Sequence, residues 1–164
     1  MRVPVELTLF ADYHQIHLFD EDSTTDPGEA WTDRAVADQV AVDGDAMAVA
    51  TAVNVEVSVT VEVLDAPPED VSASFDHVVE AGLVVPSGHL VVMGCTDYAP
   101  AAARIAVPAG PARVRVARSN LEVASLLDVG SDEDPETMER VRLQIWSAAS
   151  TGTVVLRRWP GRSS

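Results

Sequence analysis

Lysine is absent from this sequence of 164 residues, cysteine occurs once, and aromatic residues make up only 5% of the chain. The single cysteine, Cys95, excludes an internal disulfide, which is compatible with a reducing cytoplasm. With so few aromatic residues, any core must consist mostly of Val, Ala and Leu. Because hydrophobic residues reach 47% and a chain of this length can bury a sizeable core, we expect one folded domain rather than a disordered chain.

Long apolar runs are missing as well. No stretch of about 18 uninterrupted apolar residues occurs, so no membrane-spanning helix is predicted. The N-terminal segment MRVPVELTLFADYHQ lacks the continuous apolar core and the small-residue cleavage site of a signal peptide. We therefore expect a cytoplasmic protein.

Motifs for catalysis and phosphate binding are absent too. The chain has no Gly-rich phosphate loop, no G-x-S-x-G nucleophile elbow and no basic stripe with aromatic residues. Its histidines lack the close ligand pairs of a strong zinc signature, so we expect ordinary surface or half-buried side chains at His14, His17, His77 and His89. Cys95 follows an apolar run and is expected to be an inert core thiol. No catalytic residue, metal site or cofactor is predicted.

Acidic residues dominate what is present. With 26 Asp and Glu against 11 basic residues, the net charge is −15. Such a surface repels nucleic acid phosphates and anionic membranes and attracts basic partners. Solubility alone is the other explanation of this charge, and composition does not separate the two.

The stretch from Ala52 to Leu64, AVNVEVSVTVEVL, gives the clearest structural pattern. Six valines fall on alternate positions from Val53 to Val63, with polar or acidic residues between them. Since successive side chains of a strand point to opposite faces, this pattern predicts a long strand with a valine face in the core and a wettable face outside. Valine is also branched at Cβ, which favours a pleated sheet over a helix.

Other short strands are predicted at close spacing, separated by turn signals. They cover residues 3–10, 14–20, 47–51, 75–85, 89–95, 104–107, 113–119, 141–146 and 153–158. The first two are expected to pair as a hairpin, and so are the strands at 104–107 and 113–119, where Arg113 and Arg115 face outward as an exposed pair bonded to nearby acids. The fold class is therefore all-β: an antiparallel β-sandwich of about eight to ten strands with one short helix. We expect a single domain over residues 1–158 and a flexible tail at 159–164.

The segment from Asp20 to Asp45 differs from the rest, because its nine acids face one base, Arg34. Thr32 is expected to cap the short helix, whose apolar positions run from Ala35 to Val40 at helical spacing. Asp20, Asp22 and Asp26 offer hard oxygen ligands for calcium, but the segment does not match the EF-hand loop. A solvated acidic loop is therefore the favoured interpretation of these carboxylates.

Several short patterns in the first part of the chain resemble the competence protein J family. They are Tyr13-His14-Gln15 leading into Phe19-Asp20, then the acidic and threonine-rich stretch from Glu21 to Asp26, then Trp31-Thr32-Asp33. A looser likeness continues through the valine strand, residues 112–118 and residues 143–146. Members of this family inhibit a small bacterial DNA-entry nuclease.

The resemblance implies a non-enzymatic protein that binds a basic nuclease. An acidic domain can fill the basic cleft in which a nuclease holds DNA, and its charge speeds the encounter. The partner-binding residues implied are those of the acidic loop and its aromatic anchor: Asp20, Glu21, Asp22, Asp26, Glu29, Trp31 and Asp33. For Trp31 the alternative is a core plug that holds the loop down.

Two further functions stay open at this point. One is a calcium- or small-ligand-binding β-sandwich module that uses the acidic loop. The other is an enzyme with paired carboxylates in the mouth of the sandwich, which would need a raised pKa in a cleft that sequence cannot show.

Overall fold

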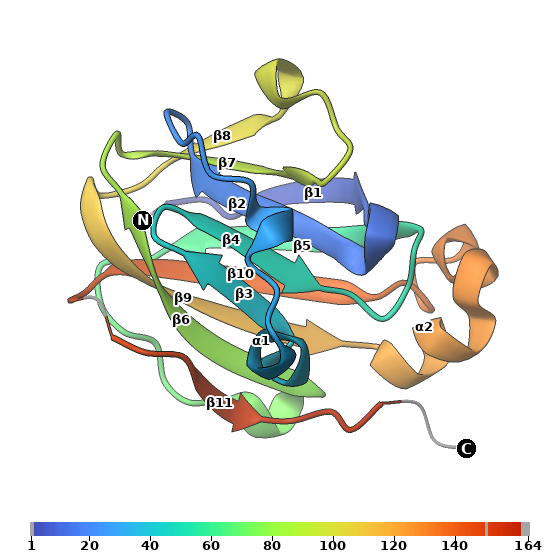
Figure 1. The fold of residues 1–164 in the computed structure, drawn as a ribbon. Helices are drawn as coiled ribbons and strands as arrows, with labels where there is room; N and C mark the ends of the chain where they lie inside the picture. Colours follow the sequence, from blue (N-terminus) through green and yellow to red (C-terminus); the bar gives the residue numbers. More distant parts are fainter. Residues whose placement is uncertain (1, 150, 162–164) are drawn as a thin grey trace.

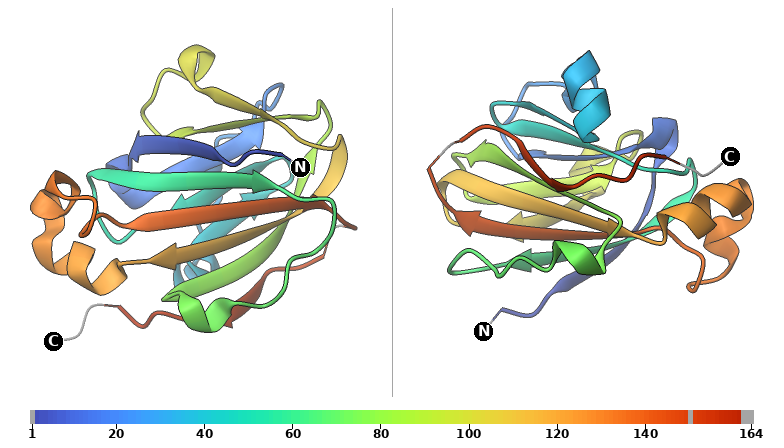
Figure 2. Two further views of the ribbon diagram at one scale, coloured as in Figure 1. Left: turned by 180° about the vertical axis from the view of Figure 1, so that it is seen from behind. Right: turned by 90° about the horizontal axis from the view of Figure 1, so that it is seen from below.

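The computed structural model describes residues 2–149 and 151–161, and their strands form two sheets packed face to face (Figures 1 and 2). The first sheet has six strands, in the order β1 (Val5–Phe10), β5 (Glu56–Val63), β10 (Arg140–Ser147), β9 (Gly110–Ser119), β6 (His77–Val85) and β11 (Val154–Arg157). The second has five, in the order β3 (Val40–Asp43), β4 (Ala46–Ala50), β2 (Gln15–Asp20), β7 (His89–Gly94) and β8 (Ala103–Ala106). The predicted sandwich is confirmed, with more strands than expected.

The valine strand forms β5 and shows the predicted alternation. Val57, Val59 and Val61 are buried in the core between the sheets, while Ser58 and Thr60 are partly exposed on the outer face. The core is built mainly of Val, Ala and Leu, as the scarcity of aromatic residues predicted.

One strand pair departs from the predicted antiparallel arrangement. β5 pairs antiparallel with β1 but parallel with β10, with Val59 opposite Val141. Between these two strands the chain forms β6 and β9 of the same sheet and β7 and β8 of the other. Alternation of side chains fixes which face is buried but carries no information about strand direction, so the sequence could not distinguish the two.

Both predicted hairpins are wrong, because each of the two connections takes the chain from one sheet to the other. β1 pairs with β5, whereas β2 pairs with β4 and β7. β8 pairs with β7, whereas β9 pairs with β10 and β6. At the first connection Tyr13 and His14 have φ of 56° and 58°, so two successive residues are left-handed and the chain turns a corner instead of reversing.

The predicted helix is α1 (Asp33–Asp38), and its cap is confirmed. The Thr32 hydroxyl accepts a hydrogen bond from the Ala35 N–H at 3.1 Å. The helix ends at Gln39, whose φ of 64° places it in the left-handed region before Val40. A second helical segment, α2 (Leu121–Leu127) continued by the 3₁₀ turn η5 (Asp128–Glu133), was not expected from the sequence and projects from one end of the sandwich (Figure 1).

Arg113 and Arg115 bond to an acid as predicted, but the prediction that they are exposed is wrong. Their residues are only 7% and 5% exposed, and both guanidinium groups contact the Glu80 carboxylate, at 3.4 and 2.8 Å. The connection between β5 and β6 covers Arg115, which donates to the Glu69 carbonyl at 2.6 Å. Arg113 instead donates to the carbonyls of Thr151 and Gly152, just before β11, at 3.0 and 2.8 Å. Burial here depends on a long connection folding back over the outer face, which alternation within a strand does not reveal.

The predicted tail lies only partly within the described residues, which end at Gly161. Trp159, its first residue, donates its N–H to His77 Nδ1 at 3.1 Å and accepts a hydrogen bond from the Gln39 side chain at 3.0 Å. Residues 162–164 lie outside the described part of the chain. Among the described helices, none combines the length and apolar character needed to cross a bilayer.

Candidate functional site

The acidic segment predicted to bind a partner does not form one patch. Gln15 and Asp20 are the first and last residues of β2, so at about 3.3 Å per residue their Cα atoms lie about 16 Å apart. Asp20, Glu21 and Asp22 lie at one end of this strand. The chain then runs back along β2, and Trp31 reaches Gln15 at the other end.

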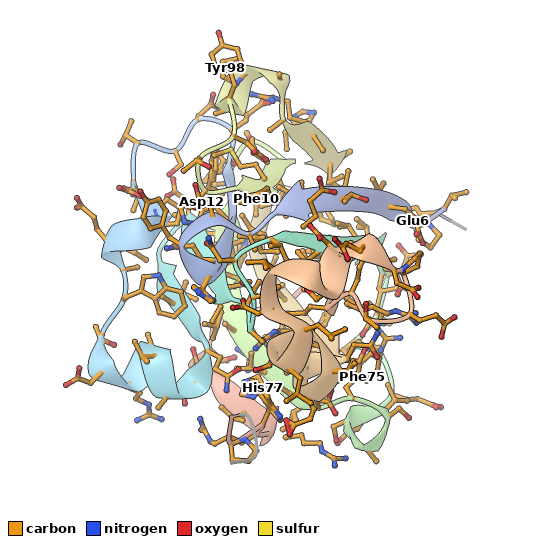
Figure 3. The ribbon with its side chains drawn as sticks, turned by 90° about the vertical axis from the view of Figure 1, so that its right-hand side faces the viewer. Glu6, Phe10, Asp12, Phe75, His77 and Tyr98 are labelled. Atoms are coloured by element: carbon orange, nitrogen blue, oxygen red, sulfur yellow. The ribbon has the colours of Figure 1, made fainter. Side chains whose placement is uncertain are left out.

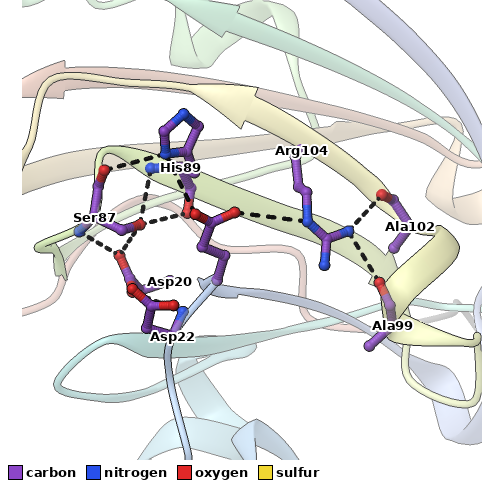
Figure 4. A network of polar contacts seen from close by, with 8 residues as sticks. Asp20, Asp22, Ser87, His89, Ala99, Ala102 and Arg104 are labelled. Atoms are coloured by element: carbon purple, nitrogen blue, oxygen red, sulfur yellow. Dashed lines mark hydrogen bonds and ion pairs between the residues drawn. The ribbon is translucent and has the colours of Figure 1, made fainter.

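Asp20 belongs to the interior rather than to the surface. Its carboxylate accepts hydrogen bonds from the Ser87 hydroxyl at 2.6 Å, the Ser87 N–H at 2.9 Å and the Asp22 N–H at 3.0 Å (Figure 4). Burial opposes its ionisation, but these hydrogen bonds outweigh burial and hold the pKa of Asp20 below its ordinary value. The side chain therefore joins the end of β2 to the turn between β6 and β7.

Replacing Asp20 with Asn should lower the free energy of unfolding by about 1.5 kcal/mol at neutral pH, because charge-assisted hydrogen bonds in a buried site are lost. A lowered folded-state pKa stabilises the protein above the unfolded pKa, and this contribution disappears as pH falls through the folded pKa. The difference between the two proteins should therefore shrink in acid. Urea unfolding at several pH values measures both effects.

Asp22→Asn is the control, at an exposed neighbouring residue, and it should change stability by less than about 0.5 kcal/mol. A loss in Asp22→Asn as large as that in Asp20→Asn would contradict this account.

Glu21 and Asp22 are exposed at the same end of β2. The Glu21 carboxylate lies 3.7 Å from Arg104 Nε and 3.5 Å from His89 Nδ1 (Figure 4). Arg104 also donates to the carbonyls of Ala99 and Ala102. Part of the negative charge at this end is thus already compensated within the protein.

The other predicted acids lie toward the opposite end of β2. Asp26 precedes the 3₁₀ turn η2 (Pro27–Glu29) and accepts a hydrogen bond from the Gly28 N–H at 2.9 Å. Gly28 lies against the side chains of Gln15 and His17. Asp26, Glu29 and Asp33 are all exposed, so their charge is available to a partner.

Trp31 is half-buried, so its ring both packs against the protein, as a core plug would, and stays partly accessible, as an anchor for a partner would. Its indole N–H donates to Gln15 Oε1 at 3.1 Å, and that oxygen also lies 2.8 Å from His17 Nε2. This contact fixes the indole against β2. The ring also lines a hollow of about 240 Å³, whose walls are Tyr13, His14, Gln15, Trp31, Val36 and Ala50.

Tyr13 is the residue at this site that sequence reasoning did not select. It lies on the 3₁₀ turn η1 (Asp12–His14), is 72% exposed and has a left-handed backbone. Tyr13 lies in the Tyr-His-Gln pattern of the family resemblance, but nothing in the pattern predicts a corner between sheets. Figure 3 shows this end of the sandwich, with Phe10 and Asp12 on the corner and Tyr98 further out on the β7–β8 connection.

Several carboxylates surround the corner. The Cys95 thiol donates to the Asp12 carbonyl at 3.1 Å. Its pKa is raised, first by partial burial and then by the negative charge of Asp12, with further contributions from Asp97 and Asp26. The thiolate is therefore disfavoured at this half-buried cysteine, in keeping with the carboxylates around it.

The histidines do not converge on one point. His17 is buried and its pKa is lowered by desolvation, with Asp26 acting in the opposite direction, whereas His14 is exposed. Within residues 2–149 and 151–161, no three His, Cys, Asp or Glu side chains are grouped closely enough to hold a metal ion. The geometry thus lends no support to a calcium site built from Asp20, Asp22 and Asp26.

Comparison with known proteins gives a match in structure but not in sequence. No family model and no curated protein matches the chain. The crystal structure of ComJ from Bacillus subtilis, an inhibitor of the DNA degrading activity of NucA, superposes with a TM-score of 0.64. The match covers 90% of this chain and 96% of ComJ at 17% identity. The chain shares the fold of ComJ.

A second solved structure has a related fold. It is described as crocagin biosynthetic gene J and matches with a TM-score of 0.52 and 18% identity, over 86% of this chain and 94% of that one. At 17% and 18% identity, the likeness of this chain to both solved structures is a likeness of fold. The resemblance to the competence protein J family inferred from short sequence patterns is confirmed at that level.

Proposed function

We propose that this chain is a non-enzymatic inhibitor that binds a basic nuclease and prevents it from degrading DNA. The observation that carries the proposal is the likeness in fold to ComJ, which covers 90% of this chain. ComJ is described as an inhibitor of the DNA degrading activity of NucA. Fold alone does not determine function, so the argument also requires a surface suited to the partner.

The charge of the chain supplies that surface. A nuclease must attract phosphates, so its DNA-binding cleft is basic, and a domain with a net charge of −15 is complementary to it. We assign the contact to the Trp31 end of the acidic segment, because Asp26, Glu29 and Asp33 are exposed there. Asp20 is excluded from the contact by its burial. A cytoplasmic site of action forms part of the proposal and agrees with the single, unpaired Cys95.

Inhibition of DNA degradation tests the proposal directly. NucA and the basic nucleases of the source cell are each mixed with the purified chain, and cleavage of a fluorogenic DNA is followed. We expect inhibition that saturates at a fixed molar ratio and weakens as salt rises, because screening removes the charge attraction. Failure to inhibit any of these nucleases at low salt would overturn the proposal.

Two triple variants with the same net charge test where the contact lies. Asp26→Asn, Glu29→Gln and Asp33→Asn together remove three acids near Trp31, while the amide introduced at position 26 keeps an oxygen that can accept the Gly28 N–H. The control removes three exposed acids elsewhere, through Asp43→Asn, Asp65→Asn and Glu69→Gln. We expect the first variant to bind on the order of tenfold more weakly at low salt and the control to bind nearly as the parent does. Equal losses would show that only the total charge matters.

A further inference from the structure

The hollow beside Trp31 has mostly apolar walls, and the side-chain polar groups of Trp31 and Gln15 are already bonded. The indole N–H is taken up by Gln15 Oε1, and the Gln15 amide nitrogen lies 3.5 Å from the Tyr13 carbonyl. Val36, on α1, adds an exposed aliphatic side chain to the lining. What a ligand meets here is therefore the rings of Trp31 and Tyr13, the Val36 side chain and the exposed side chain of His14.

The backbone holds Tyr13 at the edge of this hollow. Tyr13 and His14 both lie in the left-handed region, which non-glycine residues seldom adopt in succession. The arrangement is maintained by hydrogen bonds from the His14 N–H to the Ala11 carbonyl at 3.1 Å and to Asn54 Oδ1 at 3.3 Å. The Tyr13 N–H is bonded to Asp12 Oδ1 at 3.1 Å. The backbone that carries this exposed aromatic ring is thus held by hydrogen bonds rather than left as a free loop.

The charge around the hollow is negative. Asp12 precedes Tyr13, Asp26 lies on the turn packed against Gln15, and Asp33 is on α1 one turn before Val36. Arg34, the base on the same helix, shares the Asp38 carboxylate with Arg158, at 3.5 and 3.0 Å. An occupant with a positive charge is favoured by this rim, and an anion is repelled.

We propose that the hollow receives a lysine or arginine side chain of the partner, with its aliphatic stem against Val36 and its cation beside the rings of Tyr13 and Trp31. Cations are attracted to the faces of Trp and Tyr, and long basic side chains lay their methylene groups along apolar surface while the charge stays near water. The identity of the partner rests on the proposed inhibitor function. The chemistry of the hollow does not, and this allows the two to be tested separately.

Tyr98 provides a matched control for Tyr13. Both are exposed tyrosines, at 74% and 72%, but Tyr98 lies on the β7–β8 connection and does not line the hollow. In the nuclease inhibition assay Tyr13→Ala should raise the dissociation constant by about 30-fold, as expected for an aromatic anchor, and Tyr98→Ala by less than about threefold. Inhibition that is unaffected by Tyr13→Ala would overturn the inference and leave the proposed function standing.

A second measurement does not depend on any nuclease. The protein is labelled with ¹⁵N at its tryptophan indoles, the Trp31 signal is assigned with Trp31→Phe, and acetylated hexa-arginine amide is titrated in. We expect a saturable shift of the Trp31 signal that Tyr98→Ala retains and Tyr13→Ala reduces about tenfold or more in apparent affinity. The uncharged hexa-glutamine peptide should give no such shift. Saturation by hexa-arginine without inhibition of any nuclease would reject the proposed function and support the hollow, whereas equal shifts in both tyrosine variants would reject the hollow.

Discussion

Replacing Glu139 with Ala should destabilise the protein by about 3 to 5 kcal/mol. Glu139 is fully buried and Arg118 is 1% exposed, and Glu139 Oε2 lies 3.0 Å from Arg118 Nε. The other carboxylate oxygen accepts the Ala52 N–H at 2.6 Å. Without this carboxylate, the buried guanidinium group keeps, among the described residues, only the Gln39 side chain as a hydrogen-bond partner. The Ala52 N–H also loses its acceptor. Chemical denaturation at neutral pH measures the loss.

Two comparisons make this expectation specific. Glu62→Ala breaks the Arg142 pair, whose atoms are 3.8 Å apart and whose side chains are about a quarter exposed, and should cost less than about 1 kcal/mol. The double variant Arg118→Met with Glu139→Leu removes both buried charges at similar volume. It should be more stable than Glu139→Ala, because the main cost comes from the charge that is left alone rather than from the absence of the pair. If the double variant were as unstable as the single one, that explanation would fail.

The Arg118–Glu139 pair also shows what the sequence could not predict. Glu139 is the last acid in the stretch from Asp128 to Glu139, which the sequence indicates only as an acidic segment. Its side chain is nevertheless fully buried. Its partner comes from β9, and its second hydrogen bond comes from the segment that follows β4. Pairing of residues so far apart in the chain follows from strand order, which alternation does not encode.

Local patterns were more informative where the structure depends on nearby residues. The alternation of valines predicted the buried face of β5, and Thr32 predicted the start of α1, because each signal lies within a few residues of its effect. The candidate site required more distant information. Its acids form a run in the sequence, but the course of the chain along β2 separates them in space. The second aromatic side chain of the site, Tyr13, lies on a corner between the sheets that composition does not reveal.

Acidification should lower the free energy of unfolding through His77. The loss should be about 2 kcal/mol between pH 7 and pH 5 and about 3 kcal/mol once the pH is below the folded-state pKa. His77 is fully buried, and its Nδ1 accepts the Trp159 N–H at 3.1 Å. Its other nitrogen must then carry the proton and donate to the Asp38 carbonyl at 2.9 Å. Burial is the main reason that the pKa of His77 is lowered to about 4, and the nearby Arg118 and Arg158 add to this effect against the opposing contribution of Asp38.

The sign follows from comparing the folded and unfolded states. An unfolded histidine takes up a proton near pH 6.5, whereas folded His77 does so only near pH 4, so between these values the unfolded chain binds the extra proton and stability falls as pH falls. Protonation of Nδ1 would also set two N–H groups against each other at Trp159 and weaken the contact that holds the end of the chain. Unfolding free energies from pH 7 to pH 5 should therefore change less in His77→Gln than in the parent by about 2 kcal/mol. An unchanged slope in His77→Gln would contradict this assignment.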